Sequence, residues 1–386
     1  MKHRILLAFL FLLVIPFASA QAQTYTITDL GQLAPTAINS WGEVAGNQNG
    51  HGFVWARGWG MHDLGLLPGG TLSYAASIND HGAVTGTAYG SGTAVPFDFS
   101  YSNVECSNLG QPFLWTPKNG MVGLGVAFPS VMADYGDFCN PFYASGINDR
   151  GEIVGYTADG PDLYQWDFLW TSTGGFTLFG NTWWMTTVNG VNNANQIVGQ
   201  IGCSCDVGQA GTWKNTVGTA LESLVGAGPN MPNQNYSSAT GINDRGQIVG
   251  WSNTSTTAPV FCDDITECPM HAVLWSKTGA ISDLGTLPGD AVSAAVKINL
   301  FGKVIGTSGN AAVWQYWSPT GVGEGAVEVV GRPFIWSANK GMQDLNTLIP
   351  VSDWVLNSVS DINVWGQIVG SGTLNGETHG FLLTPL

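Results

Sequence analysis

The sequence predicts an all-β protein, a seven-bladed β-propeller closed by its own N-terminal strand. Three observations lead to this fold. One motif, Ile-Asn-x-x-Gly-x-Val-x-Gly, recurs seven times along the chain. Each copy is followed by further short apolar runs that read as β-strands. A strand that the last copy lacks stands unpaired at the start of the predicted mature chain.

The motif is best marked by its asparagine, which we interpret as a structural turn residue. Seven positions after each asparagine stands a glycine, and three positions after it stands a glycine in six copies and Asn195 in the other. Asparagine is the residue other than glycine that best tolerates a left-handed backbone, so this position is predicted to need a positive φ. The seven motif asparagines are Asn39, Asn79, Asn148, Asn192, Asn243, Asn299 and Asn363.

Each copy predicts four strands, here named A to D in chain order. Strand A ends at Ile-Asn, strand B is Gly-x-Val-x-Gly, strand C contains an aromatic-x-Trp segment such as Phe53-Val-Trp55, and strand D reads Asp-Leu-Gly-x-Leu. Such a sheet has two apolar faces and cannot bury both alone. Radial stacking of the sheets buries them, and four-stranded units of this kind are typical propeller blades.

The two ends of the chain predict that the ring is closed. The seventh unit stops at Leu386 after strand C, whereas a spare strand D, residues 25–33, precedes the first motif. Pairing the two would complete the seventh blade and remove both open sheet edges. The alternative is an open β-solenoid, in which the missing and the spare strand are unrelated.

Residues 1–22 are predicted to be a secretory signal peptide, which leaves residues 23–386 as a single propeller. Lys2 and Arg4 precede a short apolar run that ends in small residues, a pattern typical of such signals. The run is too short for a membrane span. We therefore expect a secreted or periplasmic monomer. The net charge of −15 disfavours nucleic acid as a partner.

The cysteine count indicates disulfides, because an even number in an exported chain favours pairing. The six residues are Cys106, Cys139, Cys203, Cys205, Cys262 and Cys268. Proximity in sequence suggests the pairs 106–139, 203–205 and 262–268. Zinc is the alternative, but no histidine lies near these residues in the sequence. We expect neither a metal nor another cofactor.

The repeat resembles the extracellular HAF family, named for a His-Ala-Phe tripeptide that precedes the tryptophan of strand C. Here the tripeptide appears as His51-Gly-Phe53, His271-Ala-Val273 and His379-Gly-Phe381, whereas two units carry Gln111-Pro-Phe113 and Arg332-Pro-Phe334. The resemblance covers nearly the whole mature chain. It implies a bacterial exported repeat protein and transfers no catalytic residue.

The stretch between strands B and C is where the sequence places function. The distance from the motif asparagine to the strand C tryptophan varies from 16 to 37 residues, while the hairpins are constant. Variable loops on a rigid scaffold commonly bind ligands. We expect the B–C and D–A loops to share one face, rich in aromatic and acidic residues. The ligand-binding candidates are Trp183, Trp184, Tyr135, Phe138, Trp166, Asp134 and Asp137.

Several other polar residues are predicted to be part of the scaffold. His51, His271 and His379 recur at one position, and the aspartates that open the Asp-Leu segments are expected to cap backbone amides. Asp149-Arg150 and Asp244-Arg245 are interpreted as turn residues on the face opposite the long loops.

Two functions follow from these observations. The first is a non-catalytic binding module that holds a glycan or a protein partner on its long-loop face. The alternative is a secreted polysaccharide hydrolase or lyase, which would need a close pair of carboxylates at the mouth of the central channel. No catalytic residue is assigned by sequence, because no Ser-His, phosphate-binding or His-x-x-x-His pattern occurs.

Overall fold

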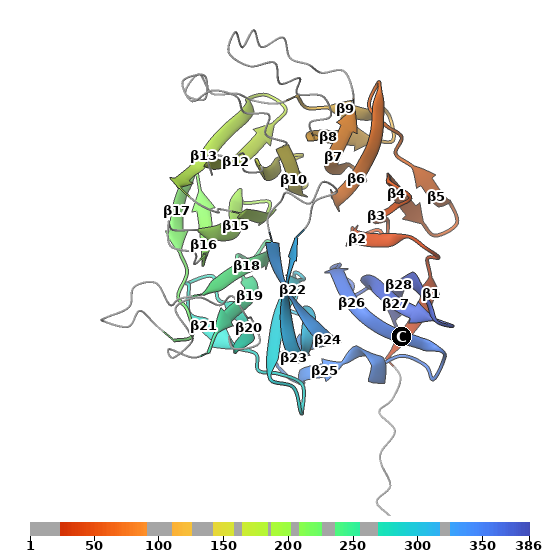
Figure 1. Cartoon of the computed structure of the whole chain (residues 1–386), viewed down its shortest axis with the longest axis vertical. Coiled ribbons are helices and arrows are strands. Elements are labelled where there is room, and N and C mark those ends of the chain that lie inside the picture. Colours follow the sequence, from red (N-terminus) through yellow and green to blue (C-terminus); the bar gives the residue numbers. More distant parts are fainter. Residues whose placement is uncertain are drawn as a thin grey trace, which may run out of the picture.

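The computed structural model describes residues 24–90, 110–125, 142–157, 164–183, 187–201, 208–225, 236–254, 269–316 and 325–386. Within these ranges the chain forms seven four-stranded antiparallel sheets around one central axis (Figure 1). In six sheets the strands follow one another in chain order. The predicted seven-bladed propeller is therefore confirmed, and the open solenoid is not what the chain forms.

The blades take the predicted order A to D, with strand A nearest the axis. Blade 1 is β2 (Ala34–Ile38), β3 (Val44–Gln48), β4 (His51–Ala56) and β5 (Gly60–Asp63). Blade 2 is β6 (Gly70–Ile78), β7 (Val84–Gly90), β8 (Gly110–Thr116) and β9 (Gly120–Gly123). Blade 3 is β10 (Phe142–Ile147), β11 (Ile153–Thr157), β12 (Tyr164–Thr171) and β13 (Gly175–Trp183). Blade 4 is β14 (Thr187–Val191), β15 (Gln196–Ile201), β16 (Gln209–Lys214) and β17 (Val217–Ala220).

The remaining blades follow the same scheme. Blade 5 is β18 (Ser237–Ile242), β19 (Ile248–Asn253), β20 (Met270–Trp275) and β21 (Ile281–Asp283). Blade 6 is β22 (Val292–Ile298), β23 (Val304–Tyr316), β24 (Gly325–Ser337) and β25 (Gly341–Asp344), after which comes the 3-10 turn η3 (Leu345–Thr347). Blade 7 is β26 (Trp354–Ile362), β27 (Ile368–Leu374) and β28 (Glu377–Pro385), with β1 (Tyr25–Asp29) as its outer strand.

The seventh blade is closed by strands from the two ends of the chain. β1 pairs antiparallel with β28, with Ile27 opposite Leu383. The Leu386 amide donates to the Thr24 carbonyl at 3.0 Å, which extends the pairing to the last residue. Tyr25 is buried at this seam, and burial raises the pKa of its phenol to about 12. Closure by the N-terminal strand is as predicted, and it leaves β28 with partners on both sides.

The blades are held together by apolar packing between neighbouring sheets. One cluster joins Ala45 and Val54 of blade 1 to Val84, Phe113 and Trp115 of blade 2. The strand C phenylalanines are among the most fully buried side chains of the described chain: Phe113, Phe168, Phe334 and Phe381. Because each sheet is buried on both faces only when it has two neighbours, the ring supplies stability that a single blade lacks.

The glycine at the end of each motif is required by a close approach of two strands. A Cβ on Gly86 or Gly155 would collide with the carbonyl oxygen of Tyr74 or Tyr143 in strand A. Strand A carries a β-bulge beside this glycine in all seven blades. The sequence showed that this glycine never varies, and the bulge gives the physical reason.

The turn between strands A and B has the predicted left-handed residue. At the third position after the motif asparagine, φ lies between 54° at Asn195 and 84° at Gly366. The side-chain Oδ1 of each motif asparagine accepts the backbone N–H groups two and four residues further on. The structural turn predicted for all seven asparagines is therefore present in every blade.

The same asparagines also join each blade to the next, which the sequence did not predict. In every blade the Nδ2 of the motif asparagine donates to the carbonyl oxygen of the motif asparagine in the following blade, at 2.9–3.1 Å. The bond from Asn363 to Asn39 closes the circle at 3.0 Å. These seven buried side chains, the asparagine ring, therefore encircle the axis with one continuous set of hydrogen bonds.

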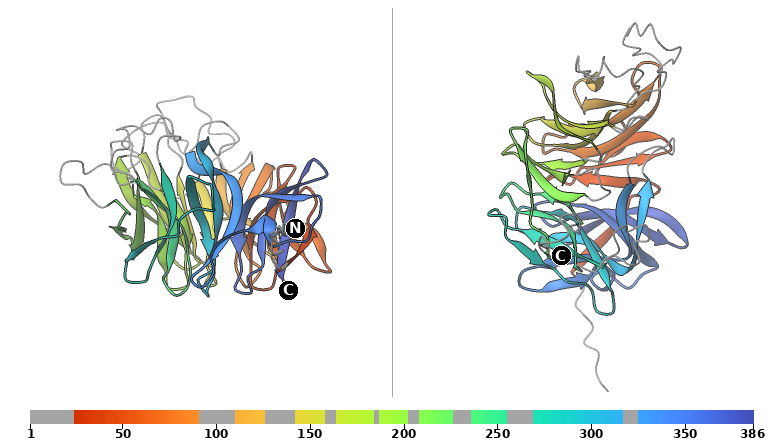
Figure 2. Two further views of the ribbon diagram at one scale, coloured as in Figure 1. Left: turned by 90° about the horizontal axis from the view of Figure 1, so that it is seen from below. Right: turned by 60° about the vertical axis from the view of Figure 1, so that its left-hand side comes forward.

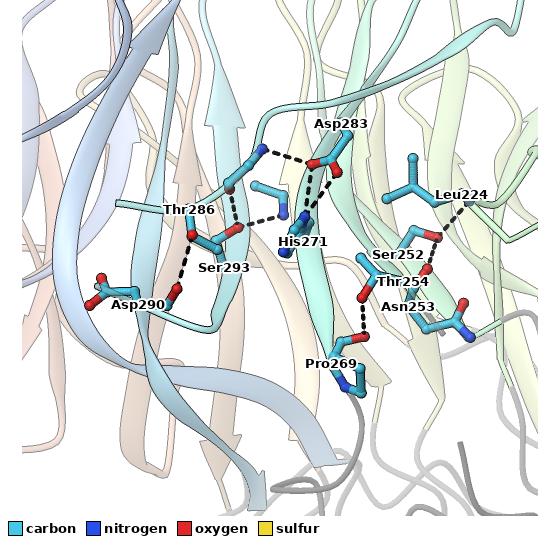
Figure 3. A network of polar contacts seen from close by, with 12 residues as sticks. Leu224, Ser252, Asn253, Thr254, Pro269, His271, Asp283, Thr286, Asp290 and Ser293 are labelled. Carbon is cyan, nitrogen blue, oxygen red and sulfur yellow. Dashed lines mark hydrogen bonds and ion pairs between the residues drawn. The ribbon is translucent and has the colours of Figure 1, made fainter. Parts of the chain in front are cut away.

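A second set of contacts joins strands C and D and the next strand A, and Figure 3 shows it in blade 5. His271 Nδ1 lies 2.9 and 3.0 Å from the two carboxylate oxygens of Asp283, and Asp283 also accepts the Gly285 amide. Ser293 of blade 6 accepts the Ala272 amide and donates to the Gly285 carbonyl. The pairs His51–Asp63, His379–Asp29 and Arg332–Asp344 repeat the first contact, which confirms the predicted scaffold role.

The antiparallel order places the A–B and C–D turns on one face of the disc and the B–C and D–A connections on the other (Figure 2, left). We call the first of these the turn face. No helix in the described part of the chain is long and apolar enough to cross a membrane.

Loss of one asparagine from the ring should destabilise the whole propeller. In Asn243→Ala, two backbone amides and the Asn299 carbonyl lose their partner. Buried polar groups without a partner cost about 1–3 kcal/mol each, so we expect the free energy of unfolding to fall by at least about 3 kcal/mol. Urea denaturation measures it. Asn339→Ala, in an exposed C–D turn, is the matched control, and equal effects of the two variants would contradict the ring's role.

The closing seam should be strengthened in mild acid. The hydrogen bond from His379 to Asp29 raises the pKa of His379 above its ordinary 6.5. The protonated form is therefore favoured in the folded state, so this contribution is complete below 6.5 and is lost as the pH rises through the raised pKa. We expect the Tm deficit of His379→Gln to be larger at about pH 5.5 than at about pH 8.5. A pH-independent deficit, or the same profile in the control His81→Gln, would refute this.

Candidate functional site

The described residues enclose a cavity at the centre of the turn face. Its volume is about 390 Å³, and it is lined by three consecutive residues from each blade: the apolar end of strand A, the motif asparagine and the residue after it. The asparagine side chains are occupied by the ring. The chemistry of the mouth therefore depends on the residue after each asparagine: Ser40, Asp80, Asp149, Asn193, Asp244, Leu300 and Val364.

One half of the mouth, in blades 1 to 5, is polar and acidic. A chain of hydrogen bonds runs from blade to blade here: the backbone amides of Ser40, Asp80, Asp149 and Asn193 each donate to the side-chain Oδ1 of the residue at the same position in the next blade, at 2.8–2.9 Å. The chain ends at Asp244, because Leu300 has no acceptor. These carboxylates thus stabilise the ring while they concentrate negative charge at the mouth.

Two of the carboxylates share a single donor. Asn193 Nδ2 lies 2.7 Å from Asp149 Oδ2 and 2.9 Å from Asp244 Oδ2. Asp80 Oδ2 instead accepts the Ser40 hydroxyl at 2.8 Å. Asp149 and Asp244 therefore have matching environments, in which both accept a backbone amide and the same side-chain amide. These hydrogen bonds fix both carboxylates at the mouth of the cavity.

The other half of the mouth, in blades 6, 7 and 1, is apolar and aromatic. Leu300 and Val364 face the cavity here. The next residue in each turn is an aromatic side chain that is largely exposed: 61% for Phe301, 69% for Trp365 and 79% for Trp41. We call these three residues the aromatic arc. They occupy the same motif position in three successive blades.

Hydrogen bonds hold both indoles of the aromatic arc in place. Trp365 Nε1 donates to the Ser40 carbonyl at 2.8 Å, and Trp41 Nε1 donates to the Asp80 carbonyl at 2.9 Å. Each tryptophan thus reaches across to the next blade and leaves most of its surface open to solvent. A ring fixed in this way loses little conformational freedom when a ligand stacks on it.

The ligand candidates predicted from sequence are not among the residues that line this cavity. Of the seven ligand candidates, Trp166 lies partly buried in β12, where its amide donates to Thr157 Oγ1, and Trp183 ends β13. The other five, Trp184, Tyr135, Phe138, Asp134 and Asp137, lie outside the described residues, as do all six cysteines. Their grouping on a long-loop face and the three disulfides stay predictions.

The turn face brings together residues that were not among the ligand candidates predicted from sequence. Asp149 and Asp244 were predicted to be turn residues, and Trp41, Phe301 and Trp365 were not singled out. One sequence pattern could have pointed to this face. In three of seven copies a large aromatic residue stands two positions after the motif asparagine, which is unusual for a tight turn. In the described ranges no group of three His, Cys, Asp or Glu side chains is arranged to hold a metal ion.

Comparisons with known proteins identify a fold and nothing more. No protein-family description and no curated protein matches the chain. A structure of streptogramin B lyase is similar with a TM-score of 0.50 and 10% identity, over 94% of this chain and 98% of that one. An acylaminoacyl peptidase from Pyrococcus horikoshii has a TM-score of 0.48 and 9% identity, over 91% of this chain and 52% of that one. At these identities the likeness to the lyase is one of architecture.

The shared amide of Asn193 should hold the acidic half of the mouth together. In Asn193→Asp the shape is kept, but the common donor is lost and a third carboxylate is placed beside Asp149 and Asp244. We expect the free energy of unfolding to fall by about 1–3 kcal/mol at neutral pH, and the loss to shrink in high salt, which screens the repulsion. Asn193→Ala, which adds no charge, is the control. A salt-independent loss, equal in both variants, would contradict the electrostatic origin.

Proposed function

We propose that this protein is an exported, non-catalytic binding propeller that holds a glycan on its turn face. The aromatic arc would support the faces of sugar rings, and the polar half of the mouth would accept hydrogen bonds from their hydroxyl groups. A ligand site commonly combines an apolar wall with a few fixed polar groups in this way.

The observation that carries the proposal is the exposure of three aromatic side chains at equivalent positions of neighbouring blades. Single exposed apolar residues need no explanation, but three exposed aromatic side chains on successive blades beside a cavity indicate an interaction surface. Sugars suit this surface because each ring has an apolar face of C–H groups and a rim of hydroxyls. The carboxylates of Asp80, Asp149 and Asp244 provide acceptors across the mouth.

The scaffold supports recognition on this face. The turns that carry the arc are fixed by the asparagine ring and by the two indole hydrogen bonds. Their geometry is therefore set before any ligand arrives. The family resemblance and the export signal stay part of this proposal, and the long-loop face stays a second predicted surface.

A polysaccharide hydrolase or lyase is the alternative function. It predicted a close carboxylate pair at the mouth, and Asp149 and Asp244 do meet on one amide. Both carboxylates are held by hydrogen bonds between neighbouring turns, which supports a structural and binding role. Release of sugar fragments from the ligands used below would reverse this preference.

The aromatic arc should dominate glycan binding. We expect the mature protein to bind members of a panel of neutral and acidic polysaccharides, and the double variant Trp41→Ala/Trp365→Ala to bind them about 10–100-fold more weakly, because each ring contributes roughly 0.5–1.5 kcal/mol beyond its buried area. Isothermal titration calorimetry measures the affinity.

Trp59→Ala is the matched control, since Trp59 is also an exposed tryptophan of the turn face but stacks on His62 in a C–D turn. It should bind like the unaltered protein. No binding to any member of the panel, or equal affinity in the double variant, would refute glycan recognition by this face.

A further inference from the structure

The positive charges of this acidic chain are concentrated on one face. Eight of its twelve lysine and arginine residues lie in or directly beside the A–B and C–D turns, and two of the other four, Lys2 and Arg4, belong to the predicted signal peptide. The eight are Arg57, Lys118, Arg150, Lys214, Arg245, Lys277, Lys303 and Lys340. Of the 27 acidic residues only five lie in these turns, namely Glu43, Asp80, Asp149, Glu152 and Asp244. The turn face is thus more positive than the net charge of −15 implies.

Three of these cations lie along the aromatic arc. The Arg245 guanidinium is 5.6 Å from the centre of the Phe301 ring. Lys303 Nζ lies 3.1 Å from the point where a Cβ on Gly366 would stand, directly beside Trp365. The side chain of Lys277 approaches Gly246, the neighbour of Arg245, in the same way at 3.4 Å. Cations and rings therefore alternate from Arg245 in blade 5 to Trp365 in blade 7.

These cations are available to a ligand. The ion pairs found within the described ranges involve His51, His271, Arg332 and His379, so none of the three cations beside the arc is paired there. Arg245 and Lys277 are exposed. A guanidinium over an aromatic ring keeps its N–H groups at the edge, where they are free to bind a carboxylate.

We propose that the ligand of the turn face is an acidic polysaccharide whose sugars carry carboxylate groups. This rests on the proposed function and names its ligand class. Sugar rings stack on Trp41, Trp365 and Phe301, while Arg245 and Lys303 bind the carboxylates of residues in register with the rings. Lys277 extends the positive edge beyond Arg245.

The arrangement favours such a polymer over nucleic acid. The phosphodiester backbone of nucleic acid would be repelled by Asp80, Asp149 and Asp244 across the mouth. The neutral edges of an acidic polysaccharide carry hydroxyl groups. These edges can lie close to the three aspartates, because hydroxyls donate hydrogen bonds to carboxylates. The aromatic-cationic arc and the acidic half of the mouth then meet different parts of one ligand.

The test compares polygalacturonate with its fully methyl-esterified form, which keeps the backbone and removes the charge. We expect the mature protein to bind polygalacturonate. Its affinity should fall about tenfold when added salt shortens the Debye length from about 30 to 8 Å. Binding of the ester should be at least about tenfold weaker, as expected for the loss of a hydrogen bond to a charged group.

The variants Arg245→Gln and Lys303→Gln should each weaken polygalacturonate binding about tenfold and leave binding of the ester unchanged. Lys118→Gln and Lys214→Gln are matched controls, because these residues lie on the turn face in blades 2 and 4, away from the arc. They should change the affinity less than about twofold.

Three outcomes overturn the inference. Equal, salt-independent binding of both polymers identifies a neutral-glycan site and leaves the proposed function standing. Stronger binding of single-stranded oligothymidylate than of polygalacturonate identifies a nucleic-acid surface. If the arc and control substitutions weaken polygalacturonate binding equally, the salt dependence arises from the overall positive charge of the turn face. Failure to bind any polysaccharide removes the proposed function itself.

Discussion

The whole architecture depends on a single repeated hydrogen bond, from the side-chain amide of one motif asparagine to the carbonyl of the next. It links sheets that share no backbone pairing, and it does so at the axis, where seven turns converge. A buried amide without a partner is costly, so opening the circle at any blade leaves groups unsatisfied in two blades. Apolar packing supplies most of the stability between blades, but it is not directional. The ring fixes the position of each blade about the axis, and thereby the position of every turn on that face.

The same interaction separates scaffold from surface within one motif. The asparagine, the left-handed residue and the final glycine are held by hydrogen bonds, φ and close approach, so they are constrained in all seven copies. The two residues directly after the asparagine face the mouth and the solvent, and they differ from blade to blade. Asp80, Asp149 and Asp244 stand in one sector, whereas Val364 with Trp365 and Leu300 with Phe301 stand in another. Seven equivalent positions have become two unlike sides of the cavity mouth.

Much of the fold was predictable, and little of the site was. The sequence contained the number of blades, their strand order and the closing strand, because these depend on local patterns: period-two strands, turn residues and a count of strands at each end. Asn195 in place of glycine correctly indicated a positive φ. The turn face was not singled out, because sequence variability was taken as the sign of function, which directed attention to the long connections. Trp41, Phe301 and Trp365 were passed over, since nothing local shows that residues more than 60 positions apart become neighbours.

Residue patterns along the chain are thus enough to predict a closed propeller of seven blades with an acidic net charge. Each of those properties is the sum of local preferences or a simple count. Folding in three dimensions places the motif asparagines in a ring and three exposed aromatic residues on the successive blades 6, 7 and 1. It also places most cations on one face. The physical reason is that ring closure, not chain order, sets these neighbours: Asn363 bonds to Asn39, and Trp365 bonds to Ser40, across nearly the full length of the chain.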